Sequence, residues 1–412
     1  MPEHPTRSTP RTARQPTAIA AARRPADAVG QILQLAVSAA LATALIAALI
    51  VSASGCAAPP PDSAEPSTPD AATPAEEAGG EGYAREAAVF EDLAPELAGL
   101  FADGAELEVL AEGFTWSEGP VWIPGADFLL FSDVPQDTVF RWSEAKGLEP
   151  WLRPSGFTGD GERSREPGAN GLYLNADGQL LLCQHGDRRV ARLDADVAAG
   201  PFLGPFEDGG PFVTITADFD GRRYNSPNDL AVHADGSIYF TDPPYGLRDE
   251  SERELAHHGV YRIVPGASAQ LLYSELTRPN GVVLSPDGST LTVANSDPEK
   301  ALWMSWPVLE DGGLGEGRVT FDATPFVSEE RPGLPDGMTV DSEGRIYATG
   351  PGGIWIFAAD GRHLGTLRLP DATANVTFGG PDRSTLYLTS HHRLLRLETT
   401  ATGHISAAGP DA

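Results

Sequence analysis

The chain has 412 residues, enough for two average domains or for one large all-β domain. Asp and Glu outnumber Lys and Arg by 58 to 29, so the formal net charge is −29, which argues against nucleic acid or an anionic membrane surface as a partner of the folded part. The only cysteines are Cys56 and Cys183, which excludes a disulfide framework, and the apolar run around Cys183 predicts a buried thiol.

Residues 1–55 are predicted to be an export leader. Five arginines precede an apolar stretch from about Ile32 to Val51, and small residues follow it. Those small residues come directly before Cys56 and resemble a bacterial lipoprotein processing box, in which the cysteine is acylated and becomes the mature N-terminus. Alternatively, the apolar stretch is long enough to remain as a membrane anchor. Both interpretations export the chain, and we expect a membrane-anchored lipoprotein facing the periplasm or the cell exterior.

The rest of the chain divides into a linker, one folded domain and a tail. Residues 56–90 are rich in Pro, Ala, Ser and Glu and are predicted to be a flexible linker. Residues 91–402 carry six repeats of one pattern: an Asx or Glx residue, an apolar run, a turn and a second apolar run. The repeats start 39 to 58 residues apart, which predicts an all-β, six-bladed β-propeller with several short strands in each blade. Residues 403–412 are the predicted tail, and residues 107–110 are expected to close the ring by joining the last blade.

The repeat pattern predicts a ring of oxygen-bearing side chains in the central channel, because the first strand of each blade lines it. The inner ring is Glu118, Asn170, Asn228, Asn280, Asp336 and Asn375. Since each hairpin returns to its starting edge, an outer ring is expected at the same mouth: Asp133, His185, Asp242, Asn295, Gly350 and Ser390. Two carboxylates and four amides suit one divalent cation such as Ca²⁺, Mg²⁺ or Mn²⁺. The alternative is that Asx-Gly pairs simply form turns.

Four motifs resemble those of the senescence marker protein/gluconolactonase/luciferin-regenerating enzyme-like family, and the likeness is strongest to bacterial gluconolactonases. They begin at Glu118, Ser226, Pro279 and Pro335, and the resemblance covers about residues 106–398. It implies that Glu118, Asn280 and Asp336 ligate one metal ion, Ca²⁺ before Mg²⁺, Mn²⁺ or Zn²⁺.

The resemblance also implies the function, metal-dependent hydrolysis of a lactone, with a sugar lactone such as gluconolactone as substrate. Asp336 would be both metal ligand and general base. The expected substrate-side residues are Asn170, Asn228, Tyr245 and Ser226. His185 is a candidate proton donor to the leaving alkoxide, or else a structural hydrogen-bonding group.

This chain departs from the family pattern at one position that concerns substrate recognition. Some animal members of the family carry an arginine where this chain has Ser226, so that recognition group is either missing or supplied elsewhere, with Arg163 and Arg165 as candidates. Two rival functions remain open: a metal-dependent phosphotriesterase, and a non-catalytic ligand-binding propeller with structural calcium. Apart from a small-molecule substrate, no partner is predicted: no protein, no nucleic acid, and membrane contact only through the leader or lipid anchor.

Overall fold

The computed structural model describes residues 82–207 and 209–404. The predicted leader, Cys56, most of the predicted linker and residues 405–412 lie outside these ranges, so those predictions stay untested. Within the described ranges, no helix has both the length and the apolar composition needed to cross a bilayer. Almost all of the regular structure there is strand, as the repeat pattern predicts.

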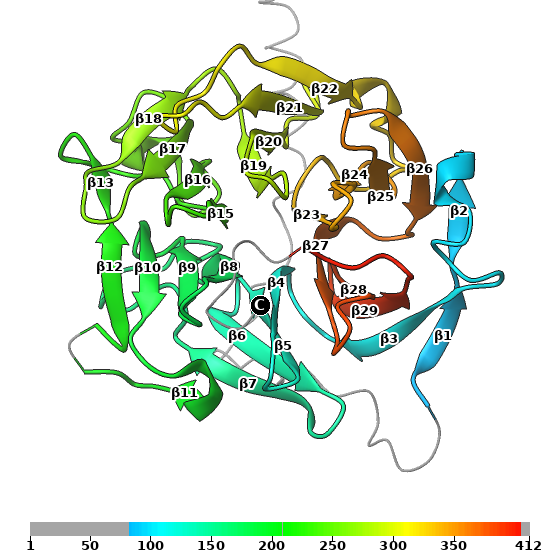
Figure 1. Ribbon diagram of the computed structural model, residues 1–412. Coiled ribbons are helices and arrows are strands. Elements are labelled where there is room, and N and C mark those ends of the chain that lie inside the picture. Colours follow the sequence, from blue (N-terminus) through cyan, green and yellow to red (C-terminus); the bar gives the residue numbers. More distant parts are fainter. Residues whose placement is uncertain (1–81, 208, 405–412) are drawn as a thin grey trace, which may run out of the picture. The chain divides into compact units, whose positions relative to one another are not determined.

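Six sheets form the blades of a propeller around a central channel (Figure 1). From the inside outward, the first three blades contain β4 (Ser117–Ile123), β5 (Phe128–Asp133), β6 (Thr138–Ser143), β7 (Gly147–Arg153) and β11 (Phe202–Leu203); β8 (Ala169–Leu174), β9 (Leu180–Gln184), β10 (Arg189–Leu193) and β12 (Phe212–Thr216); and β15 (Leu230–Val232), β16 (Ile238–Asp242), β17 (Gly259–Ile263) and β18 (Gln270–Tyr273). The prediction of a six-bladed all-β propeller is therefore confirmed, although the central metal belongs to the site described below.

The other three blades complete the circle. They contain β19 (Pro279–Leu284), β20 (Thr290–Asn295), β21 (Leu302–Pro307) and β22 (Arg318–Asp322); β23 (Met338–Val340), β24 (Ile346–Gly350), β25 (Gly353–Phe357), β26 (His363–Arg368) and β2 (Val89–Glu91); and β27 (Thr373–Gly379), β28 (Thr385–Ser390), β29 (Arg393–Glu398), β3 (Glu106–Glu112) and β1 (Ala84–Ala87). Outside the blades lie the small ladder of β13 (Asp218–Phe219) and β14 (Arg222–Arg223), and four single-turn 3₁₀ helices: η1 (Pro95–Leu97), η2 (Val197–Ala199), η3 (Glu250–Glu252) and η4 (Thr324–Phe326).

The two ends of the domain are joined through one blade. Strand β3 pairs antiparallel with β29, which confirms the predicted ring closure by residues 107–110. Strands β1 and β2 pair with β3 and β26 and so become the outermost strands of two blades. Strand β1 and the first two residues of β2 lie inside the range 56–90 predicted as linker, so part of that range belongs to the folded domain. At the other end, Gly403 bridges Asp341, so the first residue of the predicted tail contacts the fifth blade.

The core lies between adjacent blades, where apolar side chains from two sheets interleave. Trp303 of the fourth blade, for example, lies 5.8 Å from Trp355 of the fifth, measured between ring centroids. Because a blade is covered on both faces, strands such as β5 are buried along their whole length, which explains their continuous apolar runs. Cys183, in β9, is fully buried as predicted.

The glycine after the ring residue serves close approach of neighbouring inner strands. A Cβ on Gly281 would lie 2.1 Å from the carbonyl oxygen of Asp336, and one on Gly337 would lie 2.0 Å from Cγ of Asn375. Both positions require a residue without a side chain, since such contacts are far inside van der Waals distance. The Asx-Gly pairs of the inner ring therefore lie in the inner wall of the channel, where the glycine allows the next strand to approach. They do not form hairpin turns.

Candidate metal and substrate site

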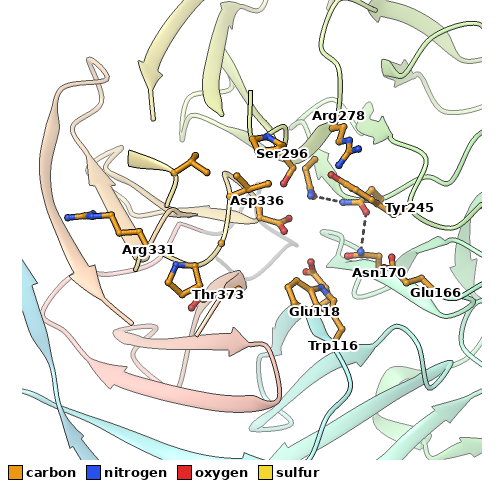
Figure 2. Close-up of a pocket in the computed structure, with 18 of the residues that line it drawn as sticks. Trp116, Glu118, Glu166, Asn170, Tyr245, Arg278, Ser296, Arg331, Asp336 and Thr373 are labelled. Carbon is orange, nitrogen blue, oxygen red and sulfur yellow. Dashed lines mark hydrogen bonds between the residues drawn. The ribbon is translucent and has the colours of Figure 1, made fainter. Parts of the chain in front are cut away.

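A cavity of about 470 Å³ lies where the inner strands begin (Figure 2). It is lined by five of the six predicted inner-ring side chains, Glu118, Asn170, Asn228, Asn280 and Asp336, which come from five different blades. The sixth, Asn375, lies on the far side of this group and donates from Nδ2 to Glu118 Oε2 at 3.2 Å. The convergence that the repeat spacing predicts is therefore present.

A chain of amide hydrogen bonds sets the orientation of these side chains. Asn170 Nδ2 donates to Asn228 Oδ1 at 3.1 Å, and Asn228 Nδ2 donates to Asn280 Oδ1 at 2.5 Å (Figure 2). Two buried oxygens in the cavity are left without a hydrogen-bond partner among the described residues, Asn170 Oδ1 and Asp336 Oδ1. A buried acceptor without a donor is costly unless a cation or a ligand satisfies it.

The end of the cavity formed by Glu118, Asn280 and Asp336 is called its floor below. The carboxyl groups buried near this floor ionise less readily than exposed ones. Burial raises the pKa of Glu118 to about 7. Burial, together with the charges of Glu118, Asp229 and Glu166, holds the pKa of Asp336 well above its usual range. Burial also raises the pKa of Glu166 and of Asp229 to about 7 each, and Glu118 adds to both shifts. Concentrated negative charge of this kind is what a divalent cation neutralises.

The side chains fit a hard divalent cation. Glu118 and Asp336 supply carboxylate oxygens and Asn280 supplies an amide oxygen, and such donors suit Ca²⁺ or Mg²⁺. Within the described ranges, no three His, Cys, Asp or Glu side chains are grouped so that they could hold a metal on their own. The fit therefore depends on amide oxygens besides the carboxylates, as the sequence pattern indicated, and the free Oδ1 of Asp336 is its strongest sign.

His185 and Ser226 do not line the cavity, contrary to the roles that sequence reasoning offered for them. His185 is fully buried, its Nε2 lies 3.0 Å from Asn228 Oδ1, and burial lowers its pKa to about 4. It is therefore neutral at pH 7 and holds Asn228 in place, the second of its two predicted roles. The Ser226 hydroxyl donates to the carbonyl oxygen of Pro243 at 2.5 Å and accepts from the N–H of Gly246 at 2.9 Å. It therefore braces the segment that carries Tyr245.

Tyr245 does line the cavity, as predicted. Burial raises the pKa of its phenol, and the nearby charge of Asp336 raises it further, while hydrogen bonds with Ser296 and Asn280 act in the opposite direction. The phenol therefore stays protonated at neutral pH and is available as a donor.

None of the outer-ring residues lines the cavity; instead, three of them hold the chain just before an inner strand. Asp133 accepts from the backbone N–H of Thr115 at 2.8 Å, and Asp242 accepts from that of Ser226 at 2.7 Å. Asn295 does the same for the fourth blade at 2.8 Å. The outer-ring residues of these three blades therefore fix the segments that lead into their inner strands.

Sequence reasoning missed several cavity residues. Glu166 comes from the 155–169 loop, and Trp116, Arg278 and Arg331 come from segments that precede inner strands or connect blades. Glu166 and Arg331 belong to no repeat position. Trp116 and Arg278 each lie two residues before a ring residue, but the six repeats carry unlike side chains there, so the pattern assigns them no chemistry. Of these, Arg278 had the clearest signal, since it directly precedes the Pro279 motif.

The arginine candidates named from sequence lie elsewhere. Arg163 forms an ion pair with Asp137 at 3.1 Å and lies over the ring of Phe157, outside the cavity lining. Arg165 does not line the cavity either.

Comparison with known proteins agrees with this geometry. Residues 116–392 match the SMP-30/Gluconolactonase/LRE-like region. The chain belongs to that family. A gluconolactonase from Zymomonas mobilis is 35% identical over 321 residues, which cover 76% of this chain and 86% of the relative.

Solved structures of the family have the same propeller. The gluconolactonase XC5397 from Xanthomonas campestris is 31% identical with a TM-score of 0.62, over 77% of this chain and 96% of that one. A calcium-binding regucalcin from Agrobacterium tumefaciens is 21% identical with a TM-score of 0.54, over 73% and 96% of the two chains, and at that identity it supports the fold alone.

Proposed function

We propose that this chain is a metal-dependent lactonase that opens sugar lactones such as gluconolactone. The observation that carries the proposal is the convergence of Glu118, Asn280 and Asp336 on one cavity floor, with Asp336 Oδ1 unpartnered. The gluconolactonases among its relatives support the reaction class, and the donor set supports Ca²⁺ or another hard cation.

Hydrolysis adds water to the lactone carbonyl carbon and breaks the bond to the ring oxygen, which leaves as a hydroxyl group. A bound divalent cation would supply Lewis-acid polarisation of the carbonyl and stabilisation of the charge on its oxygen. Asp336 Oδ1 is the free carboxylate atom at the cavity, and it accepts the proton of the attacking water. That proton then passes to the ring oxygen, so the product acid and hydroxyl balance the water consumed.

The amide side chains and Tyr245 have structural and substrate-binding roles. Asn228 is bonded to Asn170, His185 and Asn280, so its main task is to hold the floor in one arrangement. Asn170 presents a free Oδ1, an acceptor that suits a substrate hydroxyl better than an oxyanion. Tyr245 presents a protonated phenol and is the better placed donor to the substrate.

The proposal is tested by titrating acid release from D-glucono-δ-lactone in a pH-stat, after subtraction of spontaneous hydrolysis. The wild-type protein with calcium, with chelator and with calcium restored is compared with Asp336→Asn and with Asp360→Asn, an exposed control. We expect activity that is lost with chelator, recovered with calcium, and reduced by about 10³-fold or more in Asp336→Asn alone.

The rival functions give different results in the same assay. Turnover of a phosphotriester without turnover of any lactone would identify the phosphotriesterase. No turnover of either, with calcium raising thermal stability, would identify the ligand-binding propeller. Full activity in Asp336→Asn with an intact circular dichroism spectrum would remove Asp336 from the mechanism.

We also propose that the propeller is exported and anchored through an acylated Cys56. The apolar stretch and the small residues before Cys56 support this. Labelling cells with a clickable fatty acid should tag the wild-type protein and leave Cys56→Ala untagged. Equal labelling of both proteins would contradict acylation at this residue.

A further inference from the structure

Arg278 lies at the mouth of the cavity, two residues before Asn280, and its guanidinium has no assigned role in hydrolysis. We infer that Arg278 is the specificity-determining residue that binds the hydroxyl groups of the substrate ring away from the carbonyl. The inference rests on the proposed lactonase function and adds to it the residue that selects polyhydroxylated lactones over unsubstituted ones.

The backbone of Arg278 is held rigidly. Its N–H donates to Asn295 Oδ1 at 2.8 Å, and its carbonyl oxygen accepts from the N–H of Ser296 at 2.9 Å. Both partners lie at the end of β20, so the pair is fixed at the edge of the fourth blade. Figure 2 places the side chain of Arg278 beside Tyr245 and Ser296, on the side of the cavity away from Arg331. The backbone that carries the Arg278 side chain is therefore ordered before a ligand binds, which limits the entropy cost of binding.

The side chain of Arg278 differs from that of Arg331, the other arginine that lines the cavity, in forming no ion pair among the described residues. Its charge adds to the effect of a Thr277 hydrogen bond in lowering the pKa of Asp297, and the side chain is solvent-exposed. Arg331 is committed, because its Nη2 donates to Glu91 Oε2 at 2.5 Å and its guanidinium lies over the ring of Phe326. Since Arg163 is likewise paired, Arg278 is the arginine that can replace the recognition group absent at Ser226.

The chemistry of the cavity sets the orientation of the ring. The carboxylates and Asn280 occupy the floor, where the carbonyl must react, so the ring substituents are directed to the mouth. A guanidinium offers five N–H donors in one plane and no acceptor, which matches two neighbouring hydroxyl oxygens. The lining also includes Trp116, Val327 and Leu334, which can pack on the C–H face of a sugar ring.

The test compares D-glucono-δ-lactone with δ-valerolactone, which has the same ring without hydroxyls. Arg278→Ala is expected to lower kcat/KM for the sugar lactone about 10- to 100-fold, mainly through KM, because hydrogen bonds to a charged group are lost. For δ-valerolactone the change should stay within about threefold. Arg278→Lys should recover part of the loss, and D-gluconate should inhibit Arg278→Ala at least tenfold less strongly than wild type. The matched control is Arg222→Ala, an exposed arginine of β14 outside the cavity.

The outcomes separate the inference from the function it rests on. Equal losses on the two lactones, or no loss on the sugar lactone, would overturn the inference and leave the lactonase function standing. Turnover of neither lactone by the wild-type protein would overturn the proposed function and the inference together.

Discussion

Replacing Glu118 with Gln tests whether the cavity floor is built for a cation. Glu118 Oε2 accepts from the N–H of Gly119 at 3.0 Å and from Asn375 at 3.2 Å, and a glutamine oxygen can accept both. The substitution therefore removes a charge while keeping shape and hydrogen bonds. Any change in stability then reports the electrostatics of the site.

The magnitude follows from the pKa. Burial raises the pKa of Glu118 from 4.5 to about 7, so the folded metal-free protein binds more protons than the unfolded chain between those values. The contribution of this carboxyl group to the free energy of unfolding is therefore fully present below pH 4.5 and is lost as pH rises through 7. A difference of about 2.5 pKa units corresponds to about 3 kcal/mol, and Glu118→Gln avoids that loss. In chelator at pH 8, the variant should therefore be more stable than wild type by up to about 3 kcal/mol.

Calcium should reverse that order. Calcium at 1,000 times its dissociation constant stabilises the wild-type fold by about 4 kcal/mol, which exceeds the difference of about 3 kcal/mol, and the variant, lacking a carboxylate ligand, should gain far less. The assay is urea unfolding followed by circular dichroism at pH 5 and pH 8, with chelator or calcium. If Glu118→Gln lowers stability by the same amount in all four conditions, Glu118 is only a packing residue and the reasoning about the cation site is wrong.

Two further predictions concern residues around the site. Gly281→Ala should lower the free energy of unfolding by more than about 3 kcal/mol or prevent folding, because its Cβ would lie 2.1 Å from the Asp336 carbonyl oxygen. The control is Gly161→Ala, whose Cβ would meet only Phe157 at 3.8 Å. Equal thermal unfolding midpoints for the two variants would contradict this prediction. Burial lowers the pKa of His185 from 6.5 to about 4, so unfolding takes up a proton at this group and its contribution to stability falls by up to about 3 kcal/mol from pH 6.5 to 4. Urea unfolding of His185→Gln across that range should have a shallower decline towards low pH than wild type, and parallel curves would refute the assignment.

The fold was predictable because one structural unit is repeated. Hairpin spacing alone implied six blades, and the apolar run at 107–110 implied the closing strand. Strands β1 and β2 were missed because they are edge strands paired on one side only, so neither apolar alternation nor a turn signal marks them. The side chains of β1 are all exposed and those of β2 are at most partly buried, which is also why the composition of these strands resembles that of a linker.

The inner ring was predictable for the same reason, since equivalent positions in equivalent strands must meet at the channel. Asp229 was missed although it follows Asn228 directly, because strand alternation would turn it away from the cavity. The structure instead buries it beside the next inner strand, where its carboxylate accepts from the N–H of Leu230 at 2.9 Å and of Val282 at 3.4 Å. An electrostatic neighbour of this kind depends on contacts between blades, which no single repeat encodes.

Reactivity and selectivity therefore have different origins in this chain. Glu118, Asn280 and Asp336 are placed by the inner strands, whose approach is fixed by glycines that tolerate no side chain, so the backbone geometry of the floor is fixed. Arg278 lies one residue outside its strand, on a segment that Asn295 holds through the backbone N–H of Arg278 and the hydroxyl of Thr277. Neither contact involves the side chain of Arg278, which can therefore change freely. The braces of the outer ring thus allow the mouth of the cavity to be altered while the floor stays constant, and substrate preference should be decided at such pre-strand positions.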